Sequence, residues 1–386
     1  MTGPAVDIGA PPFWIAFGAA VAVLCPLGSA TARRALEAAL NLVFIGWLLG
    51  QGGVALALVW LLFVKLAVVV LERSPALRAK VFVGSVVVVG LAFVTHKLDD
   101  RPSLALAQAW LGAVGFSYVA LRTVDVFRSV AEGRSPAPSI LDLARYLFPF
   151  TMLAAGPIDA WDEFCARPYP PPVLSRDEAL QGAERIATGL FKKLVLAELV
   201  FGGFLDGFSG NWLEDLVEVQ ALYLWVYLDF SAYSDIAVGI GRFTGIHAPE
   251  NFDRPLSARN LIEFWERWHI SLSRFIRRNL FLPTQLGLAR RSRGAHPLMN
   301  ASLAYLLAFV LCGLWHGLTL RFLAWGAMHA VALVIVNAYR SALSARLGRI
   351  GLKRYMEDAR IRFVSRVVTF EFVALSLAMI APGVTR

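Results

Sequence analysis

Residues 300–339 read NASLAYLLAFVLCGLWHGLTLRFLAWGAMHAVALVIVNAY, with no acidic residue and one basic residue, Arg321. A membrane-spanning helix takes about 20 apolar residues, so this run predicts two spans with a turn near 319–321. The first span contains His316, in Leu314-Trp315-His316-Gly317. A titratable side chain at membrane depth costs free energy unless it is paired or hydrated. We therefore treat His316 as the first candidate functional residue.

The composition of the whole chain supports a membrane fold. The 386 residues are 57% hydrophobic and 17% charged, whereas soluble domains carry about 25% charged residues. We expect an all-α, polytopic membrane protein with about ten spans plus re-entrant and interfacial helices. It forms one integral membrane domain over 1–386, made of N-terminal spans (1–134), a core (135–340) and a basic segment with the last span (341–386). The predicted spans lie near 13–30, 35–50, 53–71, 80–96, 103–121, 186–206, 217–241, within 300–339, and 367–381. The apolar piece 148–157 is too short to cross and predicts a re-entrant or interfacial segment.

The charge distribution orients these spans. Residues 254–293 hold nine Arg and two Glu, a large share of the net charge of +9. Basic loops stay on the cytoplasmic side of a membrane. His316 then lies about thirteen residues, or roughly 20 Å, beyond the inner end of its span, nearer the outer surface. Nucleic acid is not an expected partner, because these Arg residues alternate with membrane-type aromatic residues.

A Trp- and Arg-rich segment precedes the His316 span. Asn260 and Glu263 have the spacing of a capping box, which predicts the start of a helix. A continuous helix from there aligns seven apolar side chains on one face: Leu261, Phe264, Trp265, Trp268, Leu272, Phe275 and Ile276. Such a helix lies at a membrane interface as an anchor, or lines a funnel into the protein. His269 falls at the border of the apolar face, where a structural, hydrogen-bonded role is also open.

The span near 217–241 contains the polar run Asp229-Phe230-Ser231-Ala232-Tyr233-Ser234-Asp235. Two carboxylates with Ser and Tyr hydroxyls are too polar to face lipid, so they line a cavity or pair with neighbouring helices. Asp229 and Asp235 are six residues apart and do not share a helix face. We therefore favour inter-helix pairing over a catalytic carboxylate pair. Lys192 and Lys193, near the inner end of their span, are expected to extend to the interface.

The remaining chemistry falls to histidines. His329 is a third histidine in the membrane segments. The three cysteines are far apart and match no metal spacing, and the sequence has no phosphate-binding loop or nucleophile elbow. We expect no bound cofactor and no metal. A neutral histidine can act as general base on an acceptor hydroxyl. If the reaction transfers an acyl group to that hydroxyl, the acyl donor would be an activated thioester, which needs no metal to polarise it.

Several motifs resemble a known family. They are Gly189-Leu190-Phe191-Lys192-Lys193, the run 229–235, Pro249-Glu250-Asn251-Phe252-Asp253-Arg254-Pro255, the segment 264–271, and Gly313-Leu314-Trp315-His316-Gly317. In order and spacing they resemble the membrane-bound O-acyltransferases, in the bacterial branch of alginate O-acetylation and D-alanyl-lipoteichoic acid transfer proteins. The resemblance covers about 150–340.

The resemblance implies a funnel-shaped helical fold with a central tunnel, in the bacterial inner (cytoplasmic) membrane. It implies His316 as the essential histidine and His269 as the second catalytic position. We expect the tunnel and its support to include Trp265, Trp268, Asp229, Ser231, Tyr233, Asp235, Trp315 and His329. The donor would be a cytoplasmic thioester, acyl-CoA or acyl-carrier protein. The acceptor would be a hydroxyl of an extracytoplasmic glycopolymer, reached directly or through a periplasmic acyltransferase or esterase-like partner.

Two departures leave the acyl group open between acetyl and D-alanyl. Alginate-type proteins usually carry a Pro-Leu-Gly-Gly turn after the histidine helix, where this chain has Leu282-Pro283-Thr284-Gln285. The chain is also closer in length to the D-alanyl transfer proteins, although its 229–235 run is similar to that of the acetylating ones. The alternative functions are a non-catalytic transporter or flippase and a scaffold for a periplasmic transferase.

Overall fold

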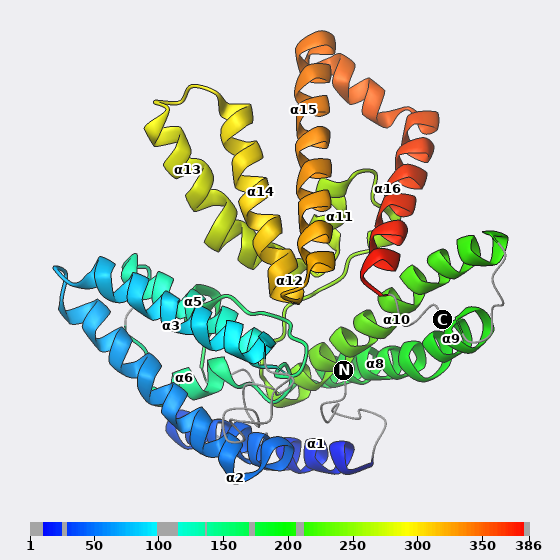
Figure 1. Cartoon of the computed structure of the whole chain (residues 1–386). Helices are drawn as coiled ribbons and strands as arrows, with labels where there is room; N and C mark the ends of the chain where they lie inside the picture. Colours follow the sequence, from blue (N-terminus) through cyan, green and yellow to red (C-terminus); the bar gives the residue numbers. More distant parts are fainter. Residues whose placement is uncertain are drawn as a thin grey trace. The chain divides into compact units, whose positions relative to one another are not determined.

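The computed structural model describes residues 11–24, 29–98, 115–135, 137–169, 174–205 and 212–381. Over these residues the chain is helical, and its extended pairing is limited to an isolated antiparallel bridge between Phe252 and Trp268. The predicted all-α membrane fold is confirmed (Figure 1). Among the described helices, five are long and apolar enough to cross a membrane: α2 (Ala30–Arg73), α3 (Arg78–Leu98), α14 (Pro297–His316), α15 (Leu320–Glu357) and α16 (Ala359–Ile380). The total of about ten spans stays a prediction.

The chain divides into two compact units. The first comprises Met1–Leu190 with Tyr233–Pro249, and the second comprises Phe191–Ala232 with Glu250–Arg386. The long helix α10 (Trp212–Thr244) contributes residues to both units, and so does α8 (Arg176–Phe191). Each unit is described by itself below.

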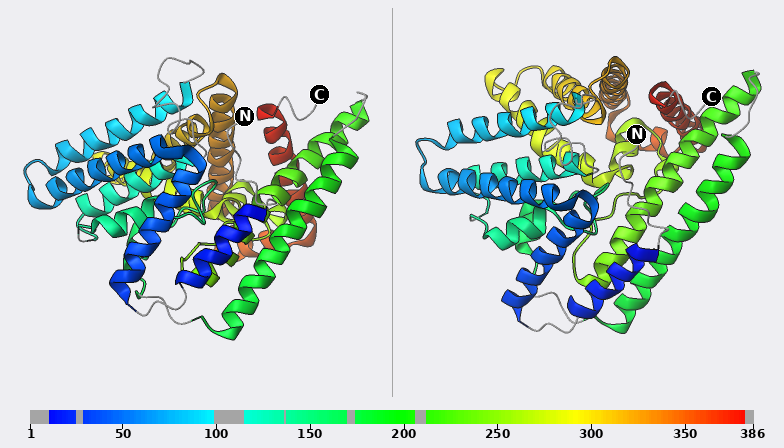
Figure 2. Two further views of the ribbon diagram at one scale, coloured as in Figure 1. Left: turned by 90° about the horizontal axis from the view of Figure 1, so that it is seen from below. Right: turned by 60° about the horizontal axis from the view of Figure 1, so that its bottom comes forward.

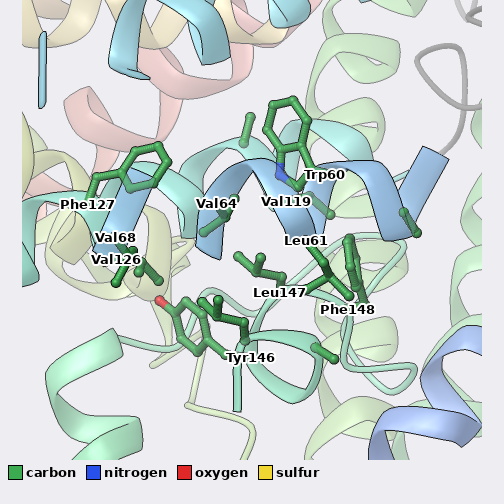
Figure 3. Close-up of a cluster of buried hydrophobic side chains, with 14 of the residues drawn as sticks. Trp60, Leu61, Val64, Val68, Val119, Val126, Phe127, Tyr146, Leu147 and Phe148 are labelled. Carbon is green, nitrogen blue, oxygen red and sulfur yellow. The ribbon is translucent and has the colours of Figure 1, made fainter. Parts of the chain in front are cut away.

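The first unit is built around α2. Its other described helices are α1 (Pro11–Leu24), α3, α5 (Phe116–Ala131), α6 (Ile140–Leu147) and α7 (Trp161–Ala166), with most of α8 and the end of α10. Trp60, Leu61 and Val64 of α2 pack with Phe127 of α5 and Leu147 of α6 in a dense apolar cluster (Figure 3).

Two of the predicted spans fall within α2. The spans 35–50 and 53–71 are separated where Gly50 has φ of 67°. Glycine adopts this left-handed conformation without a steric penalty, so the helix can change direction there. Most of the predicted span 103–121 lies outside the described residues, because the description resumes at Gly115.

The apolar piece 148–157 is irregular and largely buried, and its re-entrant or interfacial position stays a prediction. Arg122, fully buried on α5, donates hydrogen bonds to the carbonyl oxygens of Leu147 (3.3 Å), Met152 (3.0 Å) and Pro157 (2.9 Å). Buried backbone polar groups need such partners when no helix supplies them. One guanidinium therefore holds this non-helical segment in place.

The second unit holds the remaining elements. They are η1 (Lys192–Ala197), α9 (Glu198–Phe204), the start of α10, η2 (Pro255–Ser257), α11 (Leu261–Arg267), α12 (Ile270–Ile276), η3 (Arg277–Phe281), α13 (Leu282–Arg291), α14, α15 and α16. Figure 2 gives two further views of these helices. α14 and α15 converge at their connection, residues 317–319 (Figure 1). The predicted turn between two helices in 300–339 is confirmed. It begins at residue 317, two residues before the predicted start at 319.

The predicted continuous helix after Asn260 is wrong. The chain forms two short helices, α11 and α12, separated by Trp268 in an extended conformation and His269 in a left-handed one, with φ of 44°. The helix breaks because the backbone on both sides of the break bonds to residues 251 and 253 instead of continuing the helical pattern. Asn251 O accepts from Ile270 N, and Arg267 O accepts from Asp253 N, each at 3.0 Å. The seven apolar side chains that a single helix would align are nevertheless all buried.

The start of α11 is as the sequence predicts. The Asn260 side chain caps the helix by accepting from Glu263 N at 3.0 Å. The Glu263 carboxylate accepts from the backbone N–H of Arg259, at 3.0 Å. In a full capping box this carboxylate would accept from the N–H of the cap residue itself, Asn260, which is one residue later.

Candidate active site

A pair of glycines brings α14 and α15 close together in the second unit. A Cβ atom on Gly313 would lie 2.2 Å from Phe322 O, and one on Gly326 would lie 2.3 Å from Phe309 O. Small residues of this kind allow helix backbones to approach each other closely. His316 follows Gly313 by three residues, and residues three apart share a helix face. His329 follows Gly326 by the same interval, so both histidines lie beside the crossing.

The indole of Trp325 connects the two histidines. Its ring centroid lies 5.3 Å from that of His316 and 4.6 Å from that of His329. Trp265 of α11 adds a second indole, 6.0 Å from Trp325 and 5.5 Å from His329. Three helices therefore supply one aromatic and histidine cluster. The His316 ring, on the last residue of α14, also contacts Trp315 at 4.8 Å and is half-buried, whereas His329 is buried.

His269 is fixed by the break between α11 and α12. Its side chain is 3% exposed, and its Nδ1 lies 3.2 Å from Asn251 Oδ1, which also accepts from Ser271 Oγ at 2.8 Å. Because Oδ1 is an acceptor, Nδ1 carries the proton and Nε2 carries the lone pair in the neutral ring. The left-handed backbone at His269 is rare for a residue with a side chain. The pairing of the chain on both sides of it holds that conformation.

Burial sets the protonation of His269. Loss of hydration lowers its pKa to about 3, and the nearby His316 ring adds to the effect. His269 lies outside the candidate membrane-spanning helices. A pKa this low keeps its imidazole neutral at physiological pH.

The other predicted tunnel residues make specific contacts. Asp229 forms an ion pair with Lys193, and the extension of Lys193 to the membrane interface stays a prediction. Ser231 Oγ bonds back to Leu228 O at 3.4 Å. Trp268 stacks on Phe264 with ring centroids 5.5 Å apart and packs against Phe252 at 5.1 Å.

Two predicted tunnel residues belong to the first unit. Asp235 pairs with Arg185 at 2.8 Å, and the Tyr233 hydroxyl accepts from Ala155 N at 3.2 Å. Both carboxylates of the polar run therefore pair with cations from other helical segments, as the inter-helix interpretation predicts. The structure brings together Trp265, Trp315, His316 and His329 in the second unit, and the charge of His316 acts on His269 in the same unit.

Three residues of this cluster were missed from the sequence. Trp325 lies four residues before His329, on the same helix face, and this spacing was a usable signal. Asn251 lies eighteen residues from His269, and Ser376, which contacts His329, lies 47 residues from it. Their contacts depend on the tertiary fold. In the described part of the chain, no group of three or more His, Cys, Asp or Glu side chains is placed to hold a metal ion.

Comparison with known proteins places the chain in a family. The chain is 28% identical over 292 residues to the teichoic acid D-alanyltransferase of Streptococcus thermophilus, covering 72% of this chain and 70% of that protein. It is 33% identical over 239 residues to the probable alginate O-acetylase AlgI of Azotobacter vinelandii, covering 59% and 45%. It is 31% identical over 242 residues to the peptidoglycan O-acetyltransferase of Helicobacter pylori, covering 61% and 43%. The chain thus spans less than half the length of these two acetylating relatives. Residues 53–348 match the family model itself, so the chain belongs to the membrane-bound O-acyltransferase family.

Proposed function

We propose that this protein transfers an acyl group, acetyl or D-alanyl, from a cytoplasmic thioester to an extracytoplasmic hydroxyl. The acceptor is a cell-envelope or secreted glycopolymer, or a relay partner that acylates one, and the protein resides in the bacterial inner membrane. The relatives named for teichoic acid, alginate and peptidoglycan support an acceptor of this class. The donor is acyl-CoA or an acyl-carrier protein.

The observation that carries this proposal is the placement of His316. It ends α14 at the turn into α15, beside Trp325, and its charge opposes protonation of buried His269. A neutral imidazole there can accept the proton of an incoming hydroxyl while the hydroxyl oxygen attacks the thioester carbonyl. The carbon–oxygen bond forms, the carbon–sulfur bond breaks, and the leaving thiolate takes up the proton.

His269 has a supporting role in this proposal. Its ring is fixed by Asn251 and remains neutral because it is buried. A second imidazolium close by would oppose protonation of His316. A neutral His269 therefore leaves His316 free to take up the proton during transfer.

The test compares His316→Asn with wild type. Asn keeps hydrogen-bonding groups but removes the basic nitrogen, and loss of a general base lowers a rate by about 10²–10⁴. Ester-linked acyl groups on isolated envelope polymer are released with mild base, identified as acetate or D-alanine, and counted. We expect near-complete loss of these groups with normal membrane insertion.

His296→Asn is the matched control. His296 is exposed and already has a left-handed backbone, with φ of 59°, which Asn tolerates well. This variant should retain wild-type ester content. Wild-type ester content in cells that carry only His316→Asn would refute the catalytic assignment and favour a transporter or scaffold.

A further inference from the structure

The histidine cluster contains three buried polar atoms that the mechanism above does not use. They are Nε1 of Trp265, Nε1 of Trp325 and Nδ1 of His329. Within the described residues none of the three has a hydrogen-bond partner, and the side chains are 7%, 4% and 1% exposed. Buried polar atoms in native proteins are nearly always hydrogen-bonded, so each exception calls for an explanation.

The three rings that carry these atoms belong to one cluster. The rings of Trp265, Trp325 and His329 are in mutual contact, with centroids 4.6 to 6.0 Å apart. His316 lies against the Trp325 ring, at 5.3 Å. A ligand bound by these atoms would therefore lie near the proposed general base.

The hydrogen bonds of Ser376 fix the tautomer of His329. The Ser376 hydroxyl donates to Val373 O at 2.7 Å, so its single hydrogen is used. Its oxygen lies 3.1 Å from His329 Nε2 and must accept from that nitrogen. A neutral imidazole has one N–H, so Nδ1 of His329 carries a lone pair. The cluster thus offers one acceptor and two indole N–H donors.

We propose that His329, Trp265 and Trp325 together bind one hydroxyl group and hold it close to His316. A hydroxyl donates one hydrogen bond and accepts up to two, which matches this set of atoms. The hydroxyl belongs to the acceptor alcohol or to a bound water. His329 is then a positioning residue, and the inference rests on the proposed function because the hydroxyl is held for attack on the thioester.

Two amide substitutions separate this role from a structural one. The amide of Asn extends about as far as Nδ1 of histidine, and the amide of Gln about as far as Nε2. His329→Asn can therefore supply an acceptor for the hydroxyl but loses the Ser376 contact. His329→Gln keeps the Ser376 contact but removes the acceptor. A hydroxyl-binding role predicts that the Gln variant is the more damaged, whereas a role limited to packing against α16 predicts the reverse.

Transfer is measured with the full chain in nanodiscs. The donors are acetyl-CoA and a D-alanyl-carrier protein, and the acceptor is a glycerol phosphate oligomer. We expect about a tenfold loss for His329→Gln, from one lost hydrogen bond, and a smaller loss for His329→Asn. Trp325→Phe and Trp265→Phe keep an aromatic ring but delete the indole N–H, and each should also reduce transfer.

The kinetic parameters identify the source of the hydroxyl. If it belongs to the acceptor, His329→Gln raises KM for the oligomer and leaves KM for the donor unchanged. If it belongs to a water, the same variant lowers kcat and leaves both KM values unchanged. Equal activity of His329→Gln and wild type, or greater damage in His329→Asn than in His329→Gln, would overturn the proposal.

A density map tests the site without depending on transfer. An experimental map of the wild type should show an oxygen-sized peak about 2.7–3.2 Å from His329 Nδ1, alone or with the oligomer added. The peak should be missing in His329→Gln. Absence of the peak from both wild-type maps refutes the binding site. An inactive wild type with the peak present refutes the proposed function instead.

Discussion

Two buried polar centres, one in each compact unit, differ in what holds them. In the first unit, the Arg122 guanidinium carries a fixed charge and donates to three backbone carbonyls. In the second, the buried polar groups of the histidine cluster are imidazoles and indoles, and three of their nitrogens have no hydrogen-bond partner within the described residues. A permanently charged group that is bonded to the backbone stabilises a segment, whereas neutral rings with unused hydrogen-bonding capacity are available to a substrate. We therefore call the Arg122 site the architectural centre and the histidine cluster the chemical centre.

The largest expected effect is at the architectural centre. Arg122→Met removes the donor for three buried carbonyl oxygens, and each unsatisfied group costs about 1–3 kcal/mol. We expect a loss of about 3 kcal/mol or more in the free energy of unfolding, with little folded protein recovered. Thermal unfolding in detergent and the yield of monodisperse protein measure this.

Arg128→Met is the matched control on the same helix. Arg128 forms an i,i+4 ion pair with Glu132, and the two side chains are 16% and 43% exposed. Ion pairs that reach solvent in this way contribute about 0–1 kcal/mol. If the two variants unfold alike, Arg122 does not hold the 148–157 segment, and the proposed contrast between the two centres fails.

The contrast between these centres also shows what the sequence could predict. The hydropathy of 300–339 predicts the α14–α15 pair, and the burial of seven apolar side chains after Asn260 follows from their spacing. The break at Trp268 and His269 could not be predicted, because its cause is backbone pairing with Asn251 and Asp253. Local periodicity carries no information about such a partner.

The candidate site divides in the same way. His316, His269, His329 and Trp265 could be selected because polar or titratable groups among apolar residues stand out in a sequence. Asn251 and Ser376 could not, since an amide and a hydroxyl are common and their roles depend on a distant ring. Asp229 and Asp235 also stand out, but each pairs with a cation.

An effect of intermediate size should appear in the pH dependence of stability. The pKa of His269 is lowered to about 3 in the folded protein by burial and by His316, from an ordinary value of 6.5. Between these values the unfolded chain binds a proton that the folded chain does not, so stability falls as pH falls below 6.5. The contribution of this one group should be about 1.4 kcal/mol lower at pH 5.5 than at pH 7.5.

His269→Asn isolates this contribution. Asn tolerates the left-handed backbone at this position and does not titrate. Unfolding of the two proteins is followed across the pH range, and the difference between them should narrow toward low pH. A difference that is constant with pH would show that His269 is not a buried neutral group in the folded protein.

The smallest effect on the free energy of unfolding is expected at the Lys193–Asp229 pair of the second unit. These two charges pair with each other but remain accessible to solvent. The side chains are 39% and 35% exposed, so solvent screens their attraction. A double-mutant cycle with Lys193→Met and Asp229→Asn should give a coupling free energy of about 0–1 kcal/mol in unfolding. Acyl transfer should stay close to wild type if Asp229 only pairs with Lys193. Both single variants losing transfer while remaining folded would instead place Asp229 in the chemical centre. In that case α10 would contain both kinds of polar group, because Asp229 would take part in transfer whereas Asp235 pairs with Arg185.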